Sequence, residues 1–341
     1  MDNGSIFNTS GYPVEQVPYP SGYTHAHIII TAFFVTCLMV LIVIGNMLVC
    51  IAIATEKNLK TVQNWFIASL AVSDFLVGLL IMPFSLANEL MGYWIFGTLW
   101  CEVHAAMDVF LCTASINNLC LISLDRYWSI TQAVRYLKRR TPLRALFMIA
   151  FVWVVSALVS VPPLLGWSKP SRQTVIPTCS LSNDLGYVLY SAFGSFYIPA
   201  VVMVVVYVRI FRAARSRARR HVRRSLGGGA MTSSSLSDPP PEPAPAAADV
   251  ALVASCRRRK VAKARERRAV LILGLIMVSF ILAWLPFFLL YVTGALCIHC
   301  IPETAFDVAF WLGYCNSAFN PIIYTIFNRD FRRAFRKILF K

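Results

Sequence analysis

Residues 108–127 read DVFLCTASINNLCLISLDRY, an apolar stretch with a carboxylate at its start and an arginine near its end. The carboxylate, Asp108, and the arginine, Arg126, are 18 residues apart. A helix rising about 1.5 Å per residue would separate them by roughly 27 Å, close to the thickness of a bilayer core. Charges inside a membrane span are costly and usually functional. We therefore expect one helix to bind a cation near one membrane face and to report it at the other.

The composition predicts a membrane protein. The chain has 341 residues, of which 57% are hydrophobic and 14% are charged, which is too apolar for an ordinary soluble protein. A bilayer core has no water for backbone groups, so each crossing segment is expected to be a helix. Seven stretches are long enough to cross: 28–53, 63–87, 99–126, 143–165, 187–210, 268–293 and 304–326. The expected fold is an all-α membrane protein with a seven-transmembrane helix bundle.

The positive charge is confined to one side of this topology. The net charge is +16, and 30 of the 32 Lys and Arg residues fall at connections on that side. The positive-inside rule makes the side cytoplasmic and places the N-terminus outside. We expect this basic surface to meet membrane lipid and an acidic cytosolic partner. Nucleic acid is not an expected partner, because no nucleic-acid-binding motif accompanies the charge.

The connections predict five segments along the chain. They are an extracellular tail (1–27), five helices (28–210), a cytoplasmic loop (211–267), two helices (268–326) and a cytoplasmic tail (327–341). The loop has arginine-rich flanks that extend the neighbouring helices, and a middle rich in Gly, Ser and Pro that is expected to be disordered. The last segment predicts a short amphipathic helix on the inner membrane surface. The first segment lacks the features of a cleavable signal peptide, and N-glycosylation sequons begin at Asn3 and Asn8.

Four of the ten cysteines fall on the expected outer side, where disulfides persist: Cys101, Cys179, Cys297 and Cys300. A bond from Cys101 to Cys179 would tie the start of the third span to the loop before the fifth. Cys297 and Cys300 are close enough in sequence to close a small ring. They could also bind zinc with His299, although four good ligands are not evident.

Short motifs occur once per span in a fixed order. They are Gly45-Asn46, Leu70-Ala71-Val72-Ser73-Asp74, Asp125-Arg126-Tyr127, Trp153, Pro199 with Tyr207, Trp284-Leu285-Pro286, and Asn320-Pro321-Ile322-Ile323-Tyr324. In this order they resemble the rhodopsin-like (class A) G-protein-coupled receptors over nearly the full chain. Asp108 and the stretch 123–131 resemble aminergic receptors, most of all the α2-adrenergic receptors and the related octopamine receptors. Residues 63–66, 117–120 and 164–167 favour the octopamine branch.

The resemblance implies an amine pocket. Asp108 would hold the ligand ammonium, and Tyr314 would hydrogen-bond that carboxylate. Aromatic rings would clamp the ligand by stacking and cation–π attraction: Trp284, Phe287, Phe288, Tyr291 and Phe310, with Val109 and Cys112 beside Asp108. The alternative for these rings is ordinary core packing, and for Asp108 a structural carboxylate.

Two serines are expected to recognise ring hydroxyls. Ser191 and Ser195 are four residues apart, so they share a helix face. Ala192 takes a place that often carries a third polar residue, which favours a monophenol such as octopamine or tyramine over a catechol. The alternative is that each hydroxyl bonds the backbone one turn back.

The resemblance also implies a route for the signal. A polar cluster resembles the family's sodium site: Asp74, Ser115, Asn316, Ser317 and Asn320. Sodium, bound at Asp74, is the only metal expected. Arg126 would pair with Asp125 and with Glu266 at rest. On activation it would be released toward Tyr207 and Tyr324, with Pro286 and Pro321 as hinges.

The sequence therefore predicts a plasma-membrane receptor, not an enzyme, with no cofactor other than an allosteric sodium ion. The expected ligand is octopamine, with tyramine or noradrenaline at an α2-type receptor as alternatives. The expected partners are a heterotrimeric G protein of the inhibitory class and an arrestin. An amine transporter is disfavoured by the lack of inverted repeats. A retinal photoreceptor is disfavoured because segment 304–326 contains no lysine.

Overall fold

The computed structural model describes residues 19–132, 135–136, 140–167, 177–227, 246–297 and 300–340. Side chains 214, 217–227, 246–269 and 303 are not among them. The sequons at Asn3 and Asn8 and the centre of the loop, 228–245, lie outside the described residues, as does the side chain of Glu266.

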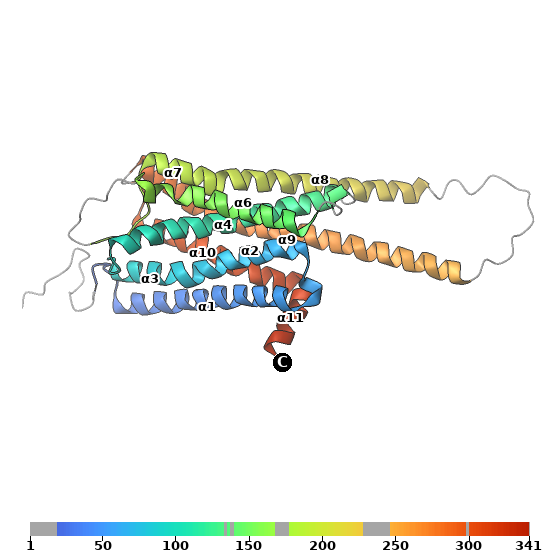
Figure 1. Ribbon diagram of the computed structural model, residues 1–341, viewed down its shortest axis with the longest axis horizontal. Helices are drawn as coiled ribbons and strands as arrows, with labels where there is room; N and C mark the ends of the chain where they lie inside the picture. The colour runs from blue at the N-terminus through green and yellow to red at the C-terminus, as the bar shows by residue number, and fades with distance from the viewer. Residues whose placement is uncertain are drawn as a thin grey trace, which may run out of the picture.

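The described residues form long helices that run side by side (Figure 1). Helix α1 spans His25–Thr55, α2 and α3 span Val62–Leu76 and Met82–Met91, α4 spans Thr98–Thr131, and α6 spans Pro142–Ser160. Helices α7 and α8 span Leu185–Ala192 and Ile198–Gly227, α9 spans Ala246–Leu296, α10 spans Glu303–Phe327, and α11 spans Arg329–Leu339. Because α2 continues into α3 and α7 into α8, these helices match the seven expected spans and the expected amphipathic helix.

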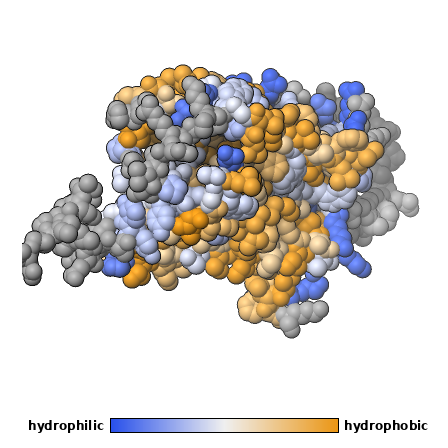
Figure 2. Space-filling view, turned by 60° about the vertical axis from the view of Figure 1, so that its left-hand side comes forward, coloured by the Kyte–Doolittle hydropathy of each residue, from blue (hydrophilic) through white to orange (hydrophobic). Residues whose placement is uncertain are grey.

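Six of the helical units are long and apolar enough to cross a membrane within the described residues. The unit that does not reach this hydropathy is α10, which carries Asn316, Ser317 and Asn320. Large apolar side chains point outward from the bundle, for example Phe34 at 66% exposure and Phe151 at 69%. Figure 2 shows hydrophobic residues covering much of one face. An apolar surface of this extent is typical of contact with lipid.

The two ends of the bundle differ. At the disulfide end, Cys101–Cys179 joins α4 to the segment before α7, and Cys297–Cys300 closes a ring between α9 and α10. The zinc alternative is therefore wrong, because both of these sulfurs are bonded to each other. At the opposite end, called here the α11 end, α8 and α9 run on beyond the bundle (Figure 1).

Helix α11 packs its apolar face against the bundle. Phe331 and Phe335 are buried, and Phe331 stacks on Tyr324 of α10 with ring centroids 5.6 Å apart. On the outer face, the Nζ of Lys337 contacts the carboxylate of Glu56 at 2.7 Å. Asn328 caps the helix by accepting a hydrogen bond from the Asp330 N–H.

Two wide π-helical turns interrupt otherwise regular helices, at Val77–Ile81 and Phe193–Tyr197. A proline follows each of them, Pro83 and Pro199. Proline lacks an N–H and its ring crowds the carbonyl four residues earlier, which in both cases lies inside the π turn. The sequence periodicity did not predict these turns. Pro286 and Pro321 lie inside α9 and α10, and their role as hinges stays a prediction.

Candidate functional site

A small cavity of about 40 Å³ lies among α4, α7, α9 and α10. Ten of the eleven residues predicted to bind ligand line it: Asp108, Val109, Cys112, Ser191, Ser195, Trp284, Phe287, Phe288, Tyr291 and Phe310. Tyr314, the eleventh, does not. The topology therefore brings together residues that are up to 202 positions apart in the chain.

Asp108 is buried and is the only carboxylate among the described lining residues. Its Oδ1 accepts a hydrogen bond from the Cys112 thiol at 3.3 Å. The Tyr314 hydroxyl interacts with the Asp108 carboxylate, as predicted, but it does not form a hydrogen bond of ordinary geometry. One turn before Asp108, the Nε2 of His104 contacts the Ile81 carbonyl at 3.2 Å. A carbonyl only accepts, so that nitrogen carries the proton.

The aromatic residues of α9 form a continuous cluster around the cavity. Phe287 stacks on Tyr291 at 5.6 Å between centroids and meets Trp284 edge-on at 5.8 Å. Phe288 stacks on Phe196 of the π turn at 4.7 Å. These rings pack the core, as the alternative interpretation expected, and they also line the cavity. That they clamp a ligand stays a prediction.

The hydroxyl groups opposite α9 are all engaged within the protein. The Ser195 and Thr113 hydroxyls are 2.7 Å apart, and the Ser191 hydroxyl donates to the Val188 carbonyl at 3.2 Å. Ser191 therefore follows the backbone-bonding alternative, whereas Ser195 pairs across helices. On α9 itself, the Tyr291 hydroxyl donates to the Ser182 carbonyl at 3.1 Å.

Three lining residues were not predicted: Thr113, Ile116 and Leu181. Leu181 follows Cys179 by two positions, so the disulfide to Cys101 at the start of α4 brings it over the cavity. That spacing was a usable signal. Thr113 and Ile116 could not be distinguished by sequence from the other small and apolar residues of α4.

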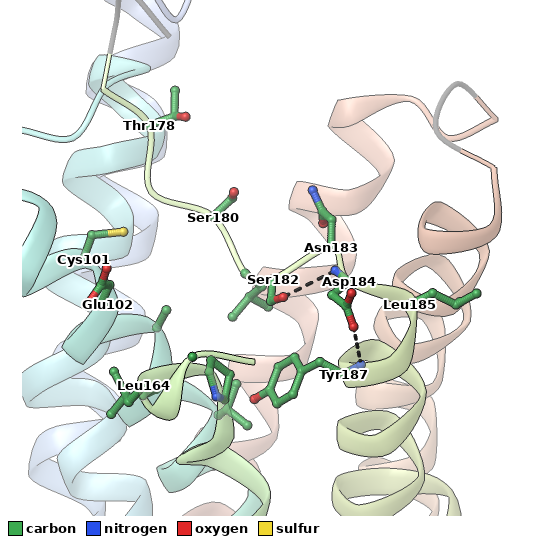
Figure 3. Close-up of a pocket in the computed structure, with 16 residues that line it drawn as sticks. Cys101, Glu102, Leu164, Thr178, Ser180, Ser182, Asn183, Asp184, Leu185 and Tyr187 are labelled. Atoms are coloured by element: carbon green, nitrogen blue, oxygen red, sulfur yellow. Dashed lines mark hydrogen bonds between the residues drawn. The ribbon is translucent and has the colours of Figure 1, made fainter. Parts of the chain in front are cut away.

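A larger cavity of about 800 Å³ lies nearer the disulfide end. Figure 3 shows the segment from Thr178 to Asp184 crossing above it, with Glu102 of α4 at one side. Asp184 caps α7 by accepting a hydrogen bond from the Tyr187 N–H at 3.1 Å (Figure 3). Val109 and Leu181 line both cavities, so the larger one borders the smaller one directly.

Of the four residues predicted to surround Asp74, three hydrogen-bond its carboxylate and Asn316 does not. The fully buried Asp74 carboxylate accepts hydrogen bonds from Ser115 at 2.6 Å, Ser317 at 2.9 Å and Asn320 at 2.7 Å. Asn316 is buried, but its side-chain amide nitrogen has no partner. In the described part of the chain, no group of three or more His, Cys, Asp or Glu residues is arranged to hold a metal.

The arginine of the Asp-Arg-Tyr motif is not paired as predicted. Asp125 accepts hydrogen bonds from Arg140 at 3.2 Å to both oxygens and from the Tyr136 hydroxyl at 2.9 Å. The guanidinium of Arg126 instead faces the side-chain amide oxygen of Gln63 on α2. The family resemblance implied the Asp125–Arg126 ion pair, but Arg140 and the Tyr136 hydroxyl of the following connection occupy Asp125 instead.

Tyr136 is held at this position as a donor. Burial, and then the nearby Asp125 carboxylate, raise the pKa of its phenol above the usual range. The hydroxyl therefore remains protonated at physiological pH and continues to donate to Asp125.

The two tyrosines predicted to receive Arg126 lie at the α11 end. Tyr207 of α8 packs closely over Gly274 of α9, where a side chain would overlap its ring. The buried Tyr324 hydroxyl has no hydrogen-bond partner.

A match to a known family accounts for this arrangement. The family described as "7 transmembrane receptor (rhodopsin family)" matches residues 45–324. The chain belongs to this family. It is therefore a receptor and not an enzyme, and it is a multi-pass membrane protein.

The receptor is similar to several curated proteins along most of its length. It is 40% identical to an alpha-2 adrenergic receptor of Labrus ossifagus, with 94% of this chain and 93% of the relative covered. It is 37% identical to a 5-hydroxytryptamine receptor 1A of Xenopus laevis, covering 87% and 88%. It is 40% identical to a probable G-protein coupled receptor No18 of Amphibalanus amphitrite, covering 91% and 89%. All three alignments include the span that carries Asp108.

Proposed function

We propose that this receptor binds a biogenic amine at Asp108, with octopamine as the native ligand, and couples this binding to a G protein. The observation that carries the proposal is the position of Asp108, the one carboxylate among the described residues of an aromatic-lined, buried cavity. A protonated amine supplies the countercharge that a buried carboxylate requires. The surrounding rings offer stacking and cation–π contacts to an aromatic amine.

The hydroxyl groups of the cavity favour a phenol. Ser191 and Ser195, with Thr113, give a small polar region in an otherwise apolar lining. Ala192 is buried and supplies no further hydroxyl. One ring hydroxyl is therefore easier to satisfy than two, which favours octopamine or tyramine over noradrenaline. A site built for a hydroxyl discriminates strongly against ligands that leave its polar groups unpaired.

Noradrenaline is the second candidate, and the 40% identity to an alpha-2 adrenergic receptor supports it. Octopamine and noradrenaline differ by one ring hydroxyl, and the contacts of Ser191 and Ser195 are the part of the site that would distinguish them. Coupling to an inhibitory G protein, and binding of an arrestin, are proposed on the same likeness.

The small volume of the cavity supports a coupling mechanism. Ligand sites usually enclose about 300–1,000 Å³, so an aromatic amine has to displace side chains of the aromatic cluster. Trp284 is part of that cluster and lies two residues before Pro286 in α9. Movement of Trp284 would thus change the kink of α9, and a ligand that favours the changed state shifts the population toward it.

We propose that the α11 end faces the cytoplasm and the N-terminus the outside. The excess of basic residues at the connections of that end supports this orientation. Arg126, Tyr207 and Tyr324 then lie where a helix of the G protein would enter as α9 moves outward. Glu266 remains a proposed resting-state partner of Arg126.

A sodium ion is proposed as an allosteric ligand at Asp74. The chemistry of the donors fits, because a carboxylate with hydroxyl and amide oxygens suits a hard cation. Asp74, Ser115, Ser317 and Asn320 would hold the ion. It would supply a positive charge to a carboxylate that is otherwise stabilised only by hydrogen bonds.

A cellular cAMP assay with octopamine, tyramine, noradrenaline and dopamine tests the proposal. The expected result is that octopamine is the most potent and lowers cAMP. The variant Asp184→Asn removes a carboxylate of the neighbouring cavity. It serves as the control and should respond to octopamine as the wild type does. Greater potency of noradrenaline would assign the receptor to the second candidate. No response to any amine would contradict the amine site.

A further inference from the structure

A third cavity, of about 410 Å³, lies near the α11 end and plays no part in the proposed function. It is bordered by α2, the end of α4, the connection after it and the start of α6. Its described lining combines three arginines with four aromatic residues: Arg135, Arg140, Arg144, Phe66, Trp128, Tyr136 and Phe147. No acidic residue occurs among the described residues that line it.

The positive charge of this cavity is built from more than one element. Arg140 uses its Nη1 to contact Asp125 and Ser129, which leaves other N–H donors on its guanidinium. Its Cζ lies 6.0 Å from the Tyr136 ring centroid. The first turn of α6 borders the cavity through Arg144, and the positive end of a 19-residue helix adds to the attraction for an anion.

The other side of the cavity is apolar and faces outward. Phe147 of α6 is 68% exposed, and its neighbours Leu143 and Leu146 are exposed as well. These side chains lie at the start of a membrane-spanning helix, next to the level expected for lipid headgroups. Trp128 and Tyr136 are residue types that favour this interface. The cavity therefore presents a basic region and an apolar region to the same occupant.

We propose that this cavity binds an anionic phospholipid of the cytoplasmic leaflet. Arg135, Arg140 and Arg144 contact its phosphate oxygens, and an acyl chain lies along Phe147. Arginine is well suited to this role because its guanidinium matches phosphate geometry. A free phosphate ion would leave the apolar wall unused. The site is distinct from the diffuse attraction of lipid to the basic surface, because it requires these particular side chains.

The lipid site is connected to the Asp-Arg-Tyr motif at the end of α4. Arg140 contacts Asp125, the residue beside Arg126, so the Asp125 carboxylate offsets part of the positive charge that Arg140 presents to the lipid phosphate. Removing the charge at position 125 therefore strengthens lipid binding.

Native mass spectrometry of the purified full chain tests this. The receptor is exposed to equal amounts of phosphatidylserine and phosphatidylcholine with identical acyl chains, and the ratio of bound lipids is measured. The wild type should prefer phosphatidylserine. The variant Arg135→Gln/Arg144→Gln should lose that preference by about fivefold per arginine removed. Asp125→Asn should increase it.

The matched control is Arg333→Gln/Arg336→Gln, which removes two exposed arginines from α11. It should keep most of the preference. Arg144→Lys keeps the charge but not the guanidinium, so it should keep part of the preference, which separates lost charge from lost folding. Equal losses in the two double variants would overturn the site in favour of diffuse surface charge. Equal binding of the two lipids by the wild type, or full displacement of phosphatidylserine by inorganic phosphate, would also overturn it.

Discussion

The indole of Trp284 on α9 lies directly against Gly313 on α10. A Cβ atom at position 313 would be 2.8 Å from the six-membered ring of Trp284, closer than real Cβ contacts come. The absence of a side chain at Gly313 is thus what allows Trp284 its position beside the ligand cavity and near Pro286. A substitution at Gly313 therefore tests the proposed coupling between the ligand and α9.

We predict that Gly313→Ala raises basal signalling several-fold and lowers thermal stability. Overpacking of a core contact costs about 1–3 kcal/mol. This cost destabilises the state in which Trp284 lies against residue 313. The population therefore shifts toward states in which Trp284 has moved. Basal cAMP and thermal unfolding of the purified receptor measure the two effects. Gly294→Ala, where a Cβ meets only ordinary contact, is the control. Wild-type behaviour of Gly313→Ala in both measurements would contradict the role given to Trp284.

The hydroxyl groups of the cavity predict a ligand-dependent effect. Ser191→Ala and Ser195→Ala should each lower octopamine potency by about tenfold, in line with the cost of leaving a polar group unpaired. Potency of phenylethylamine, which has no hydroxyl, should change little. Thr113→Val should weaken octopamine in the same way, because Thr113 pairs with Ser195.

Dose–response curves for both ligands in the cAMP assay measure this selectivity. Ser160→Ala provides a control, since Ser160 is a buried serine of α6 that bonds its own helix backbone. Losses of equal size for octopamine and phenylethylamine would show that the serines support the fold rather than recognise the ring.

The cluster at Asp74 predicts an ion effect. Sodium should weaken agonist binding to the wild type, because the ion stabilises the arrangement in which Ser115, Ser317 and Asn320 surround Asp74. Asp74→Asn should abolish the effect. Radioligand competition in sodium chloride and in N-methylglucamine chloride at equal ionic strength separates sodium from general screening. A sodium effect that persists in Asp74→Asn would remove Asp74 from the site.

The contact between Arg126 and Gln63 predicts opposite effects of two substitutions. Gln63→Leu removes the acceptor and should raise basal signalling, because Arg126 is released from α2. Gln63→Glu adds a negative charge and should lower it. Basal cAMP at matched surface expression measures both, with Lys60→Ala on the exposed connection before α2 as control. Changes in the same direction for both Gln63 variants would exclude this contact as a restraint on Arg126.

The sequence predicted the fold and most of the ligand site, because spans and helical spacing depend on local patterns. Asp108, the aromatic residues of α9 and the two serines lie on predictable faces of predictable helices. The π turns near Pro83 and Pro199 were missed, since they depend on how a proline strains the preceding turn. The partners of Arg126 and Asp125 were also missed. They are set by Gln63, Tyr136 and Arg140, whose positions follow from tertiary packing rather than from neighbouring sequence.

The most direct test of the account is the affinity of the purified receptor for octopamine in the wild type and in Asp108→Asn. Asparagine keeps the size of the side chain and removes its charge, so the measurement isolates the ion pair. Loss of one partner of a buried charge pair costs about 2–5 kcal/mol, which predicts a loss of affinity of at least about 30-fold. Asp184→Asn should bind octopamine as the wild type does. Equal affinity of the wild type and Asp108→Asn would contradict the claim that Asp108 holds the ligand's ammonium.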